Sequence, residues 1–519
     1  MSGVALALCF PNWDQTWLAW VALTPLISAV WFSKPPLKRK WLFHAGLGYC
    51  AGLAFFWLTF RWLITVTAIG WFVLAFYLAL YLAFWAWFIG TIACHREAVG
   101  KLDVATSPWT RSRRNLTVAL LGASGWVAQE ALRGILFTGF GWNGLGVALH
   151  DEVAFLQIAN ITGVAGLSFL VALCNLMIVI TLKRVLIEVG RVKLRPHYDF
   201  SLTIFLVVLV FAYGIGQLQT QEETVPVRLA SVQANIPQNQ KFDRAFEHRI
   251  FETYTRLTEA AAVYHPDLLL WPEAATPLPV FADWQNYTFV RNAASLGDYN
   301  FLFGSLDFEG EDGFNVAILY AGPDSEPQLH RKIHLVPFGE YIPFRHSFPL
   351  FAWIAGDLVP GDFVGGQEFT LLETRDPVLR IAPLICFEDT LGDLTRQFVK
   401  NGADLLVNVT NDGWFLKSEA AEQHLANAVF RAAENGRPLV RSANTGVTAF
   451  IDRFGNVRMA LRDENGGHFM EGVLFGELPV PVNGALTFYT RYGEVFAILC
   501  SSVTVLAIGL AAFRRRRAQ

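Results

Sequence analysis

The sequence predicts a polytopic α-helical membrane domain of about eight spans, with a soluble α/β domain inserted between spans seven and eight. Two observations support this prediction. The chain has 519 residues, of which 53% are hydrophobic and only 16% are charged, whereas soluble domains carry about 25% charged residues. The apolar residues also form long runs on both sides of one polar-patterned block, roughly Val225 to Pro481.

The apolar runs are long enough to cross a membrane, since a spanning helix needs about 20 mostly apolar residues. A shorter opening run, Val4–Phe10, is interpreted as a short first span. The longer runs are Leu18–Phe32, Trp41–Val66, Ile69–Cys94, Leu116–Phe137, Ile158–Leu182, Leu202–Leu218 and Val495–Phe513. We therefore expect a transmembrane domain at 1–220, an inserted domain at 221–485, and a final span with a basic tail at 490–519.

Basic residues concentrate in alternate loops between these runs. They lie at Lys34–Lys40, Arg96–Arg114, Lys183–Arg195 and Arg514–Arg517. Loops rich in Lys and Arg stay on the cytoplasmic side of a membrane. With eight spans all four clusters fall on that side, so the inserted block is expected to face the opposite compartment.

The inserted block alternates short β-rich runs with amphipathic helical patterns, expected at Arg244–Tyr264 and Ser418–Asn435. The predicted strands are Val227–Gln233, Asp267–Trp271, Asn300–Ser305, Val316–Tyr320, Leu379–Ile385, Leu405–Val409, Pro438–Arg441, Val447–Asp452 and Gly472–Gly476. Strands mixed with helices in this way indicate an α/β layered domain.

Three chemically reactive side chains occur in this block. Cys386 and Glu273 each follow an apolar run, and Lys332 lies in the segment His330-Arg-Lys-Ile-His334. A thiolate is a nucleophile, a carboxylate can take up and return its proton, and an ammonium can stabilise the anions that form. Each residue alone also fits an ordinary structural role: core packing, a helix cap or a solvated charge. The prediction of a site therefore depends on their local motifs.

These motifs are Trp271-Pro-Glu273, Arg331-Lys332 followed by Pro337-Phe-Gly-Glu340, and Cys386-Phe-Glu388. With them the block resembles the nitrilase superfamily, whose Glu-Lys-Cys enzymes have a four-layer αββα fold. The resemblance covers roughly Val227 to Gly476. It implies an αββα sandwich in which Glu273, Lys332 and Cys386 form the catalytic triad.

Further motifs make the resemblance more specific. They are Gln233-Ala-Asn-Ile-Pro-Gln238, His334-Leu-Val-Pro-Phe-Gly-Glu-Tyr-Ile-Pro343 and Asn408-Val-Thr-Asn-Asp-Gly-Trp-Phe415. With these motifs, and with the domain placed between spans, the chain resembles the apolipoprotein N-acyltransferase family. The resemblance implies transfer of the sn-1 acyl group of a phospholipid, expected to be phosphatidylethanolamine, through a thioester on Cys386. The acceptor would be the N-terminal amine of a diacylglyceryl-cysteine apolipoprotein, the last step of lipoprotein maturation.

The resemblance also implies supporting roles for Glu340, Glu388 and Phe387, and a bacterial inner-membrane location with the inserted domain on the periplasmic side. Phe387 stands where a tyrosine is common in the family. Lipid contacts are expected from Phe242, which stands where some members carry tryptophan, and from four further aromatic residues. These are Trp414 and, in an aromatic arm after Pro343, Phe344, Phe351 and Trp353.

The net charge and the spacing of the Cys and His residues argue against two classes of function. A net charge of −3 does not suggest a nucleic-acid partner, and no spacing of Cys and His residues matches a zinc site. We expect no metal and no other cofactor, with the bilayer, a phospholipid donor and an apolipoprotein acceptor as partners. Two alternatives stay open: a membrane-tethered amidase that hydrolyses a carbon–nitrogen bond, and a transporter with a degenerate soluble domain.

Overall fold

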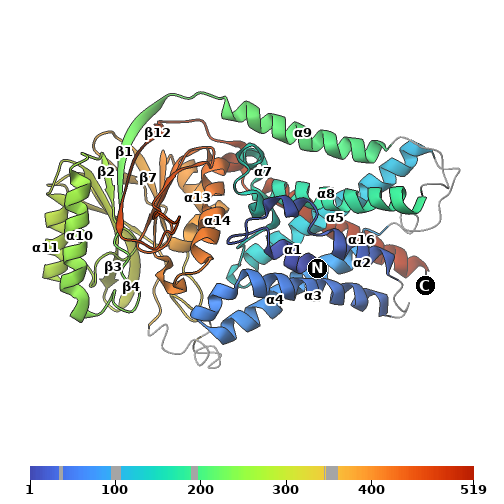
Figure 1. The fold of residues 1–519 in the computed structure, drawn as a ribbon, viewed down its shortest axis with the longest axis horizontal. Helices are drawn as coiled ribbons and strands as arrows, with labels where there is room; N and C mark the ends of the chain where they lie inside the picture. The colour runs from blue at the N-terminus through green and yellow to red at the C-terminus, as the bar shows by residue number, and fades with distance from the viewer. Residues whose placement is uncertain (34–38, 95–106, 189–196, 344, 346–360, 519) are drawn as a thin grey trace. The chain divides into compact units, whose positions relative to one another are not determined.

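The computed structural model describes residues 1–33, 39–94, 107–188, 197–343, 345 and 361–518 (Figure 1). The chain forms two compact units. One comprises Met1–Ile64, Ala68–Gln219 and Glu494–Gln519, and the other comprises Thr65–Thr67 and Thr220–Gly493. We call them the helical unit and the catalytic unit. The finer boundaries expected from the sequence, at 220 and 485, stay a prediction.

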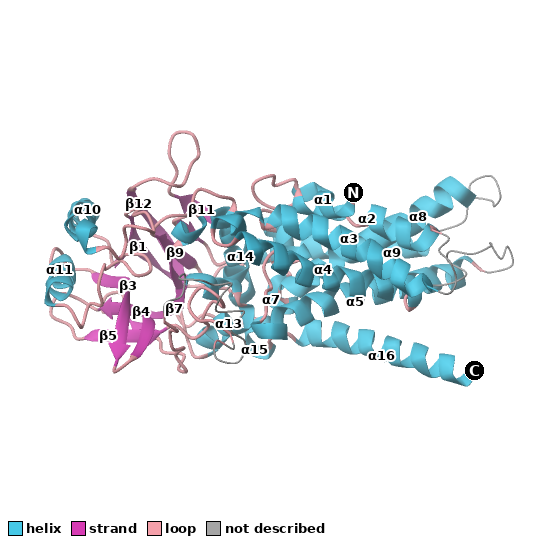
Figure 2. Cartoon of the chain, turned by 90° about the horizontal axis from the view of Figure 1, so that it is seen from below, coloured by secondary structure: helices cyan, strands magenta, loops and turns pink. Residues whose placement is uncertain are grey.

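The helical unit consists of helices, as Figure 2 shows, and short 3₁₀ turns occur between some of them. The helices are α1 (Ser2–Ala7), α2 (Thr24–Phe32), α3 (Lys40–Thr59), α4 (Ala68–Thr91), α5 (Pro108–Ile135), α6 (Val153–Leu156), α7 (Ala159–Thr162), α8 (Val164–Lys183), α9 (Tyr198–Leu218) and α16 (Val495–Ala518). Within the described residues, five segments are long and apolar enough to cross a membrane. They are Lys40–Thr59, Ala68–Thr91, Val164–Leu186, Tyr198–Leu218 and Val495–Arg517.

The other predicted spans differ from a simple spanning helix. Helix α1 has only 6 residues, which at about 1.5 Å per residue is far shorter than a bilayer core. Helix α5 has 28 residues but carries Arg and Glu side chains near its ends. The expected count of eight spans therefore stays a prediction, whereas a multi-helix apolar unit is confirmed.

Close backbone contact holds α3 against α4. A Cβ atom on Gly48 of α3 would lie 2.3 Å from the carbonyl oxygen of Leu82 in α4. Only glycine fits at that distance. Small residues at such crossings let helices approach closely where the surrounding lipid gives no hydrophobic driving force.

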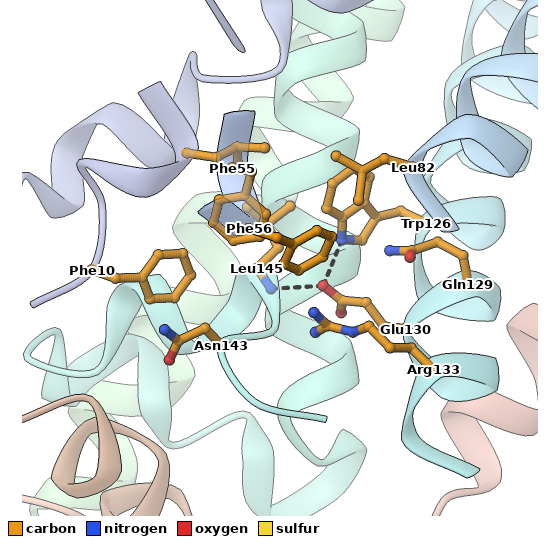
Figure 3. A pocket seen from close by; sticks show the side chains of 11 residues that line it. Phe10, Phe55, Phe56, Leu82, Trp126, Gln129, Glu130, Arg133, Asn143 and Leu145 are labelled. Atoms are coloured by element: carbon orange, nitrogen blue, oxygen red, sulfur yellow. Dashed lines mark hydrogen bonds between the residues drawn. The ribbon is translucent and has the colours of Figure 1, made fainter. Parts of the chain in front are cut away.

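Polar side chains of α5 line one wall of a small pocket in the helical unit (Figure 3). Glu130 Oε1 accepts hydrogen bonds from Trp126 Nε1 at 2.8 Å and from the main-chain N–H of Leu145 at 2.7 Å. Arg133, one turn further along, is buried with its guanidinium 5.6 Å from the Phe56 ring centroid. Glu130 thus joins α5 to the segment that follows it in the chain.

The catalytic unit is built around two six-stranded sheets. The first has the order β12-β1-β2-β3-β4-β5 and the second β11-β10-β9-β8-β7-β6. The first-sheet strands are β1 (Thr224–Gln233), β2 (Leu268–Leu270), β3 (Asn300–Glu309), β4 (Asp312–Tyr320), β5 (Pro327–Arg331) and β12 (Gly472–Pro481). The second-sheet strands are β6 (Leu372–Glu373), β7 (Arg380–Ile385), β8 (Leu405–Thr410), β9 (Leu439–Ala443), β10 (Ala449–Ile451) and β11 (Val457–Ala460).

The two sheets have the same arrangement of parallel and antiparallel strands. Strands β1, β2 and β3 run parallel in the first, and β7, β8 and β9 run parallel in the second. The outer pairs of each sheet are antiparallel. The carboxyl ends of parallel strands meet at one edge of a sheet, which is where ligand and catalytic sites of α/β folds lie.

Alternating strand residues separate two apolar cores. Val227 and Leu229 of β1 face the second sheet and pack in a core that includes Ile381 and Val407. Their neighbours face a core formed with α10 (Glu247–Ala262) and α11 (Trp284–Ala294). On the far side, α13 (Gly392–Lys400) and α14 (Ala420–Asn435) contact the second sheet. The predicted αββα layering is confirmed.

Candidate active site

Cys386 begins a 3₁₀ turn (Cys386–Thr390) directly after β7. Its φ angle is +54°, a left-handed conformation that costs free energy for a residue with a side chain. Such strain is typical of reactive residues that a sharp strand-to-helix turn presents outside the sheet. The side chain of Cys386 is partly exposed, whereas Ile385 before it is fully buried.

Glu273 lies just past β2 and is 8% exposed. Its backbone fits against β3, because a Cβ atom on Gly304 would lie 2.6 Å from the Glu273 Cα. The main-chain N–H of Gly304 donates to the Pro272 carbonyl at 3.1 Å. Asn315 of β4 donates from Nδ2 to Glu273 Oε1 at 2.7 Å, which fixes the carboxylate.

Lys332 directly follows β5 and is 1% exposed. Its Nζ donates to Glu340 Oε1 at 2.8 Å and lies 3.9 Å from Glu273 Oε1. The Asn315 amide also reaches Glu340 Oε1, at 3.1 Å. The ammonium and the amide therefore hold the two carboxylates next to Lys332. The main chain of Lys332 is fixed in turn, since its carbonyl accepts from the Gly366 N–H at 2.7 Å.

Glu388 joins the ends of the two strands that carry the site. Its Oε1 accepts from the main-chain N–H groups of Ile333 and His334, at 2.8 and 2.9 Å, directly after Lys332. Its Oε2 accepts from the N–H of Ile385 at 2.8 Å, directly before Cys386. Because β5 belongs to the first sheet and β7 to the second, this buried carboxylate sets the spacing between Lys332 and Cys386.

Burial and charge together set the protonation of the site. Burial raises the pKa of the Cys386 thiol and Glu273 raises it further, while Lys332 opposes them. Burial also raises the pKa of Glu273, with Lys332 opposing and Glu340 adding to the shift. Burial disfavours the Lys332 cation, but Glu340 and Glu273 outweigh it, so the pKa of Lys332 is raised. A protonated thiol thus lies near a permanently charged ammonium and a carboxylate of increased basicity.

Burial raises the pKa of Glu388 to about 7, against the opposing effects of Lys332 and of the N–H donors from His334, Ile385 and Ile333.

The structure brings Glu273, Lys332, Glu340, Glu388 and Cys386 together as one interacting group. Phe387 lies next to Cys386 and stacks on His334, with ring centroids 5.9 Å apart. Phe242 and Trp414 are exposed, 44% and 40%, and among the described residues neither takes part in the hydrogen bonds and ion pairs of the triad. Phe344, Phe351 and Trp353, with most of the predicted arm, lie outside the described residues.

Three residues of the site were not predicted from the sequence. Asn315 lies inside an ordinary strand, and nothing in its local sequence marks it as a partner of two distant carboxylates. Lys241, a buried lysine, donates from Nζ to the Glu273 carbonyl oxygen at 2.6 Å. His424 of α14 contacts Asp389 at 2.7 Å and Asp412 at 2.8 Å.

This histidine belongs to a buried network that reaches both turns flanking the site. Arg441 pairs with Asp389, three residues after Cys386, and lies 3.6 Å from Asp412. Burial opposes protonation of His424, but Asp389 and Asp412 outweigh it and raise its pKa to about 9. No group of three or more His, Cys, Asp and Glu side chains within the described part of the chain could hold a metal ion.

Comparison with known proteins agrees with this architecture. A carbon–nitrogen hydrolase family model matches residues 228–481, so the catalytic unit is of the nitrilase class. A model of the apolipoprotein N-acyltransferase N-terminal domain matches residues 2–177. The apolipoprotein N-acyltransferase of Geobacter metallireducens is 36% identical over 533 residues, covering 99% of this chain and 95% of that relative. The chain therefore belongs to the apolipoprotein N-acyltransferase family.

A second relative matches a smaller part of the chain. The apolipoprotein N-acyltransferase of Azotobacter vinelandii is 34% identical over 424 residues, covering 79% of this chain and 76% of its own length. Among solved structures, a CN-hydrolase superfamily protein from Xanthomonas campestris is 19% identical with a TM-score of 0.37. That match covers 49% of this chain and 90% of the other.

Proposed function

We propose that the protein transfers a fatty acyl group from the sn-1 position of a phospholipid to the N-terminal amine of a diacylglyceryl-cysteine apolipoprotein. Cys386 is the nucleophile, Glu273 the general base and acid, and Lys332 the stabiliser of negative charge. The observation that supports this best is the buried arrangement of Glu273 3.9 Å from Lys332, with both acting electrostatically on Cys386. It occurs in a chain of the apolipoprotein N-acyltransferase family.

In the first step Glu273 takes the thiol proton, and the sulfur attacks the ester carbonyl carbon of the donor. Lys332 and the main-chain N–H of Phe387 stabilise the oxyanion. As the intermediate collapses the carbon–oxygen bond breaks, and Glu273 returns its proton to the departing lysophospholipid alkoxide. The acyl group is then held as a thioester on Cys386. The raised pKa of Glu273 makes it a better base for this transfer.

In the second step the amine of the apolipoprotein attacks the thioester carbon. Glu273 takes a proton from the attacking nitrogen, the carbon–sulfur bond breaks, and the thiolate leaves with its charge stabilised by Lys332. An amide forms and the thiol is restored when Glu273 returns the proton. Water competes with the amine at this stage, so the low exposure of Glu273 and Lys332 favours transfer over hydrolysis.

Both proposed substrates carry fatty chains, which fits a catalytic unit attached to an apolar helical unit. Phosphatidylethanolamine is the proposed donor. We further propose that the protein resides in the bacterial inner membrane with the catalytic unit on the periplasmic side, because Arg514–Arg517 lie at the C-terminal end of α16, the last helix. Green fluorescent protein fused after the C-terminus should therefore fold and fluoresce in the cytoplasm. A fusion that is dark although the protein is produced would contradict this orientation.

The reaction is tested by incubating the purified full chain with phosphatidylethanolamine and measuring its intact mass. One acyl group should appear on wild-type protein, be absent from Cys386→Ser, and disappear when a diacylglyceryl-cysteine peptide is added. The peptide should gain the same mass. Release of free fatty acid with no acylated peptide would instead identify a hydrolase, and a wild-type chain that never gains mass would refute the thioester.

A further inference from the structure

A second buried ammonium contacts the proposed base and interacts electrostatically with the proposed nucleophile. Lys241 belongs to the turn between β1 and the 3₁₀ helix Arg244–Phe246, and its side chain is 3% exposed. A lysine is rarely buried to this extent without a partner. Its partner is the main-chain carbonyl of Glu273, which accepts from Nζ at 2.6 Å. Ala274, the next residue, has a φ of +43°, so this hydrogen bond stabilises a strained turn.

The charged groups facing Cys386 come from several elements. Glu273, Lys332 and Asp412 act on its thiol, and Lys241 interacts electrostatically with both Cys386 and Glu273. Asp412 is already paired with His424, and Arg441 lies 3.6 Å from it. The charge of Asp412 is therefore largely balanced before any reaction begins.

The remaining charges are predominantly negative without Lys241. When the thiol proton has moved to Glu273, the thiolate and Glu340 carry two negative charges, and the Glu388 carboxylate adds a third, against the single positive charge of Lys332. A positively charged Lys241 offsets one of the excess negative charges. A nearby cation favours an anionic group by about one to three pKa units. Burial lowers the pKa of Lys241 to about 8, although Glu273 and Cys386 oppose the shift, so most Lys241 is charged at neutral pH.

We propose that Lys241 is a positioning residue for the thiol chemistry: its ammonium holds the Glu273 main chain in place and its charge stabilises the Cys386 thiolate. This inference rests on the proposed role of Cys386 as nucleophile. Lys241 thus makes two separate contributions. Its hydrogen bond positions Glu273, and its positive charge favours ionisation of the Cys386 thiol.

Alkylation of Cys386 tests the charge directly, because iodoacetamide reacts with the thiolate and needs neither lipid substrate. The rate is followed between pH 6 and about 10.5 in the purified full chain, by mass analysis of the peptide that contains Cys386. Three variants are compared: Lys241→Met removes the charge and the donor, Lys241→Gln keeps a donor without charge, and Lys241→Arg keeps both. Lys417→Met, at an exposed lysine, is the matched control.

At pH 7, where Lys241 is charged, the Met and Gln variants should alkylate about tenfold more slowly than the wild type, and the difference should shrink above about pH 8, where Lys241 loses its proton. At pH 7 Arg and the Lys417 control should match the wild type. The charge role is overturned if the Gln variant alkylates with the wild-type pH profile, or if Arg restores nothing. Failure of the proposed function would give a different result. The wild type would then transfer no acyl group, whatever the pH dependence of its alkylation.

Discussion

Lys332 donates to Glu340 at 2.8 Å, so the ammonium expected to stabilise the oxyanion is held by a carboxylate outside the triad. Glu273, the proposed base, is the more distant partner at 3.9 Å. Because Lys332 pairs more closely with Glu340 than with Glu273, its charge does not fully neutralise the base. It also gives Glu340 an electrostatic role, because its charge raises the pKa of Glu273.

Replacing Glu340 with Gln should therefore weaken the base. Without the Glu340 charge the pKa of Glu273 falls, so the acid limb of the pH profile of kcat/KM moves to lower pH. The plateau should fall about 10- to 100-fold because a weaker base and a less fixed ammonium serve the same step. Initial rates of peptide acylation measure both changes, with exposed Glu311→Gln as the control. An acid limb that stays in place would show that Glu340 does not act on Glu273.

Gly304→Ala tests the placement of Glu273. The new methyl group would meet the Glu273 Cα at 2.6 Å, where backbone and not a flexible side chain must yield. Such overpacking costs about 1–3 kcal/mol of stability, and it displaces the base, so activity should fall more than stability does. Gly361→Ala, where a Cβ meets no atom within 4 Å, is the control. Thermal unfolding and acylation rates are measured on both variants, and equal activity in the two would contradict the placement.

Glu388→Gln tests whether one carboxylate sets the distance between Lys332 and Cys386. A Gln side chain has one acceptor oxygen and one donor group, so it cannot accept from Ile385 and from Ile333 and His334 through separate oxygens. A buried N–H left without an acceptor costs about 1–3 kcal/mol. We expect a loss of acylation and slower alkylation of Cys386, while Glu326→Gln, at an exposed position, should change neither.

Strands with strong apolar patterns could be predicted from the sequence, whereas three of the four strands at the sheet edges could not. Each strand expected from the sequence corresponds to an observed one, whereas β5, β6 and β11 were missed. All three are edge strands. An edge strand packs on fewer neighbours, so its sequence needs no continuous apolar run. β5 shows this with Pro327-Gln-Leu-His-Arg331, although it positions Lys332.

The proposed triad could be predicted from the sequence because its motifs resemble a known superfamily. The groups that orient the triad could not be predicted in this way. Asn315 bridges Glu273 and Glu340 across 42 and 25 residues of sequence. A single asparagine in a strand is chemically unremarkable until the fold brings those carboxylates to it. Lys241 was passed over for the same reason, since burial turns an ordinary lysine into a charge that acts on the site.

The buried network around His424 makes stability depend on pH. Burial opposes its protonation, but Asp389 and Asp412 raise its folded-state pKa to about 9, above the ordinary value of 6.5. The folded chain therefore binds this proton more tightly than the unfolded chain does. Its stabilising contribution is complete below about pH 6.5 and is lost as pH rises through about 9.

Between pH 6.5 and 9.5 the thermal unfolding midpoint of the wild type should fall by about 5 °C more than that of His424→Gln, which cannot titrate. The comparison isolates His424 because Lys241 and Glu388 titrate equally in both proteins. His248→Gln, at a side chain 87% exposed, should keep the wild-type slope. Parallel slopes for wild type and His424→Gln would mean that the Asp389–His424–Asp412 network holds the two turns beside Cys386 with a neutral imidazole.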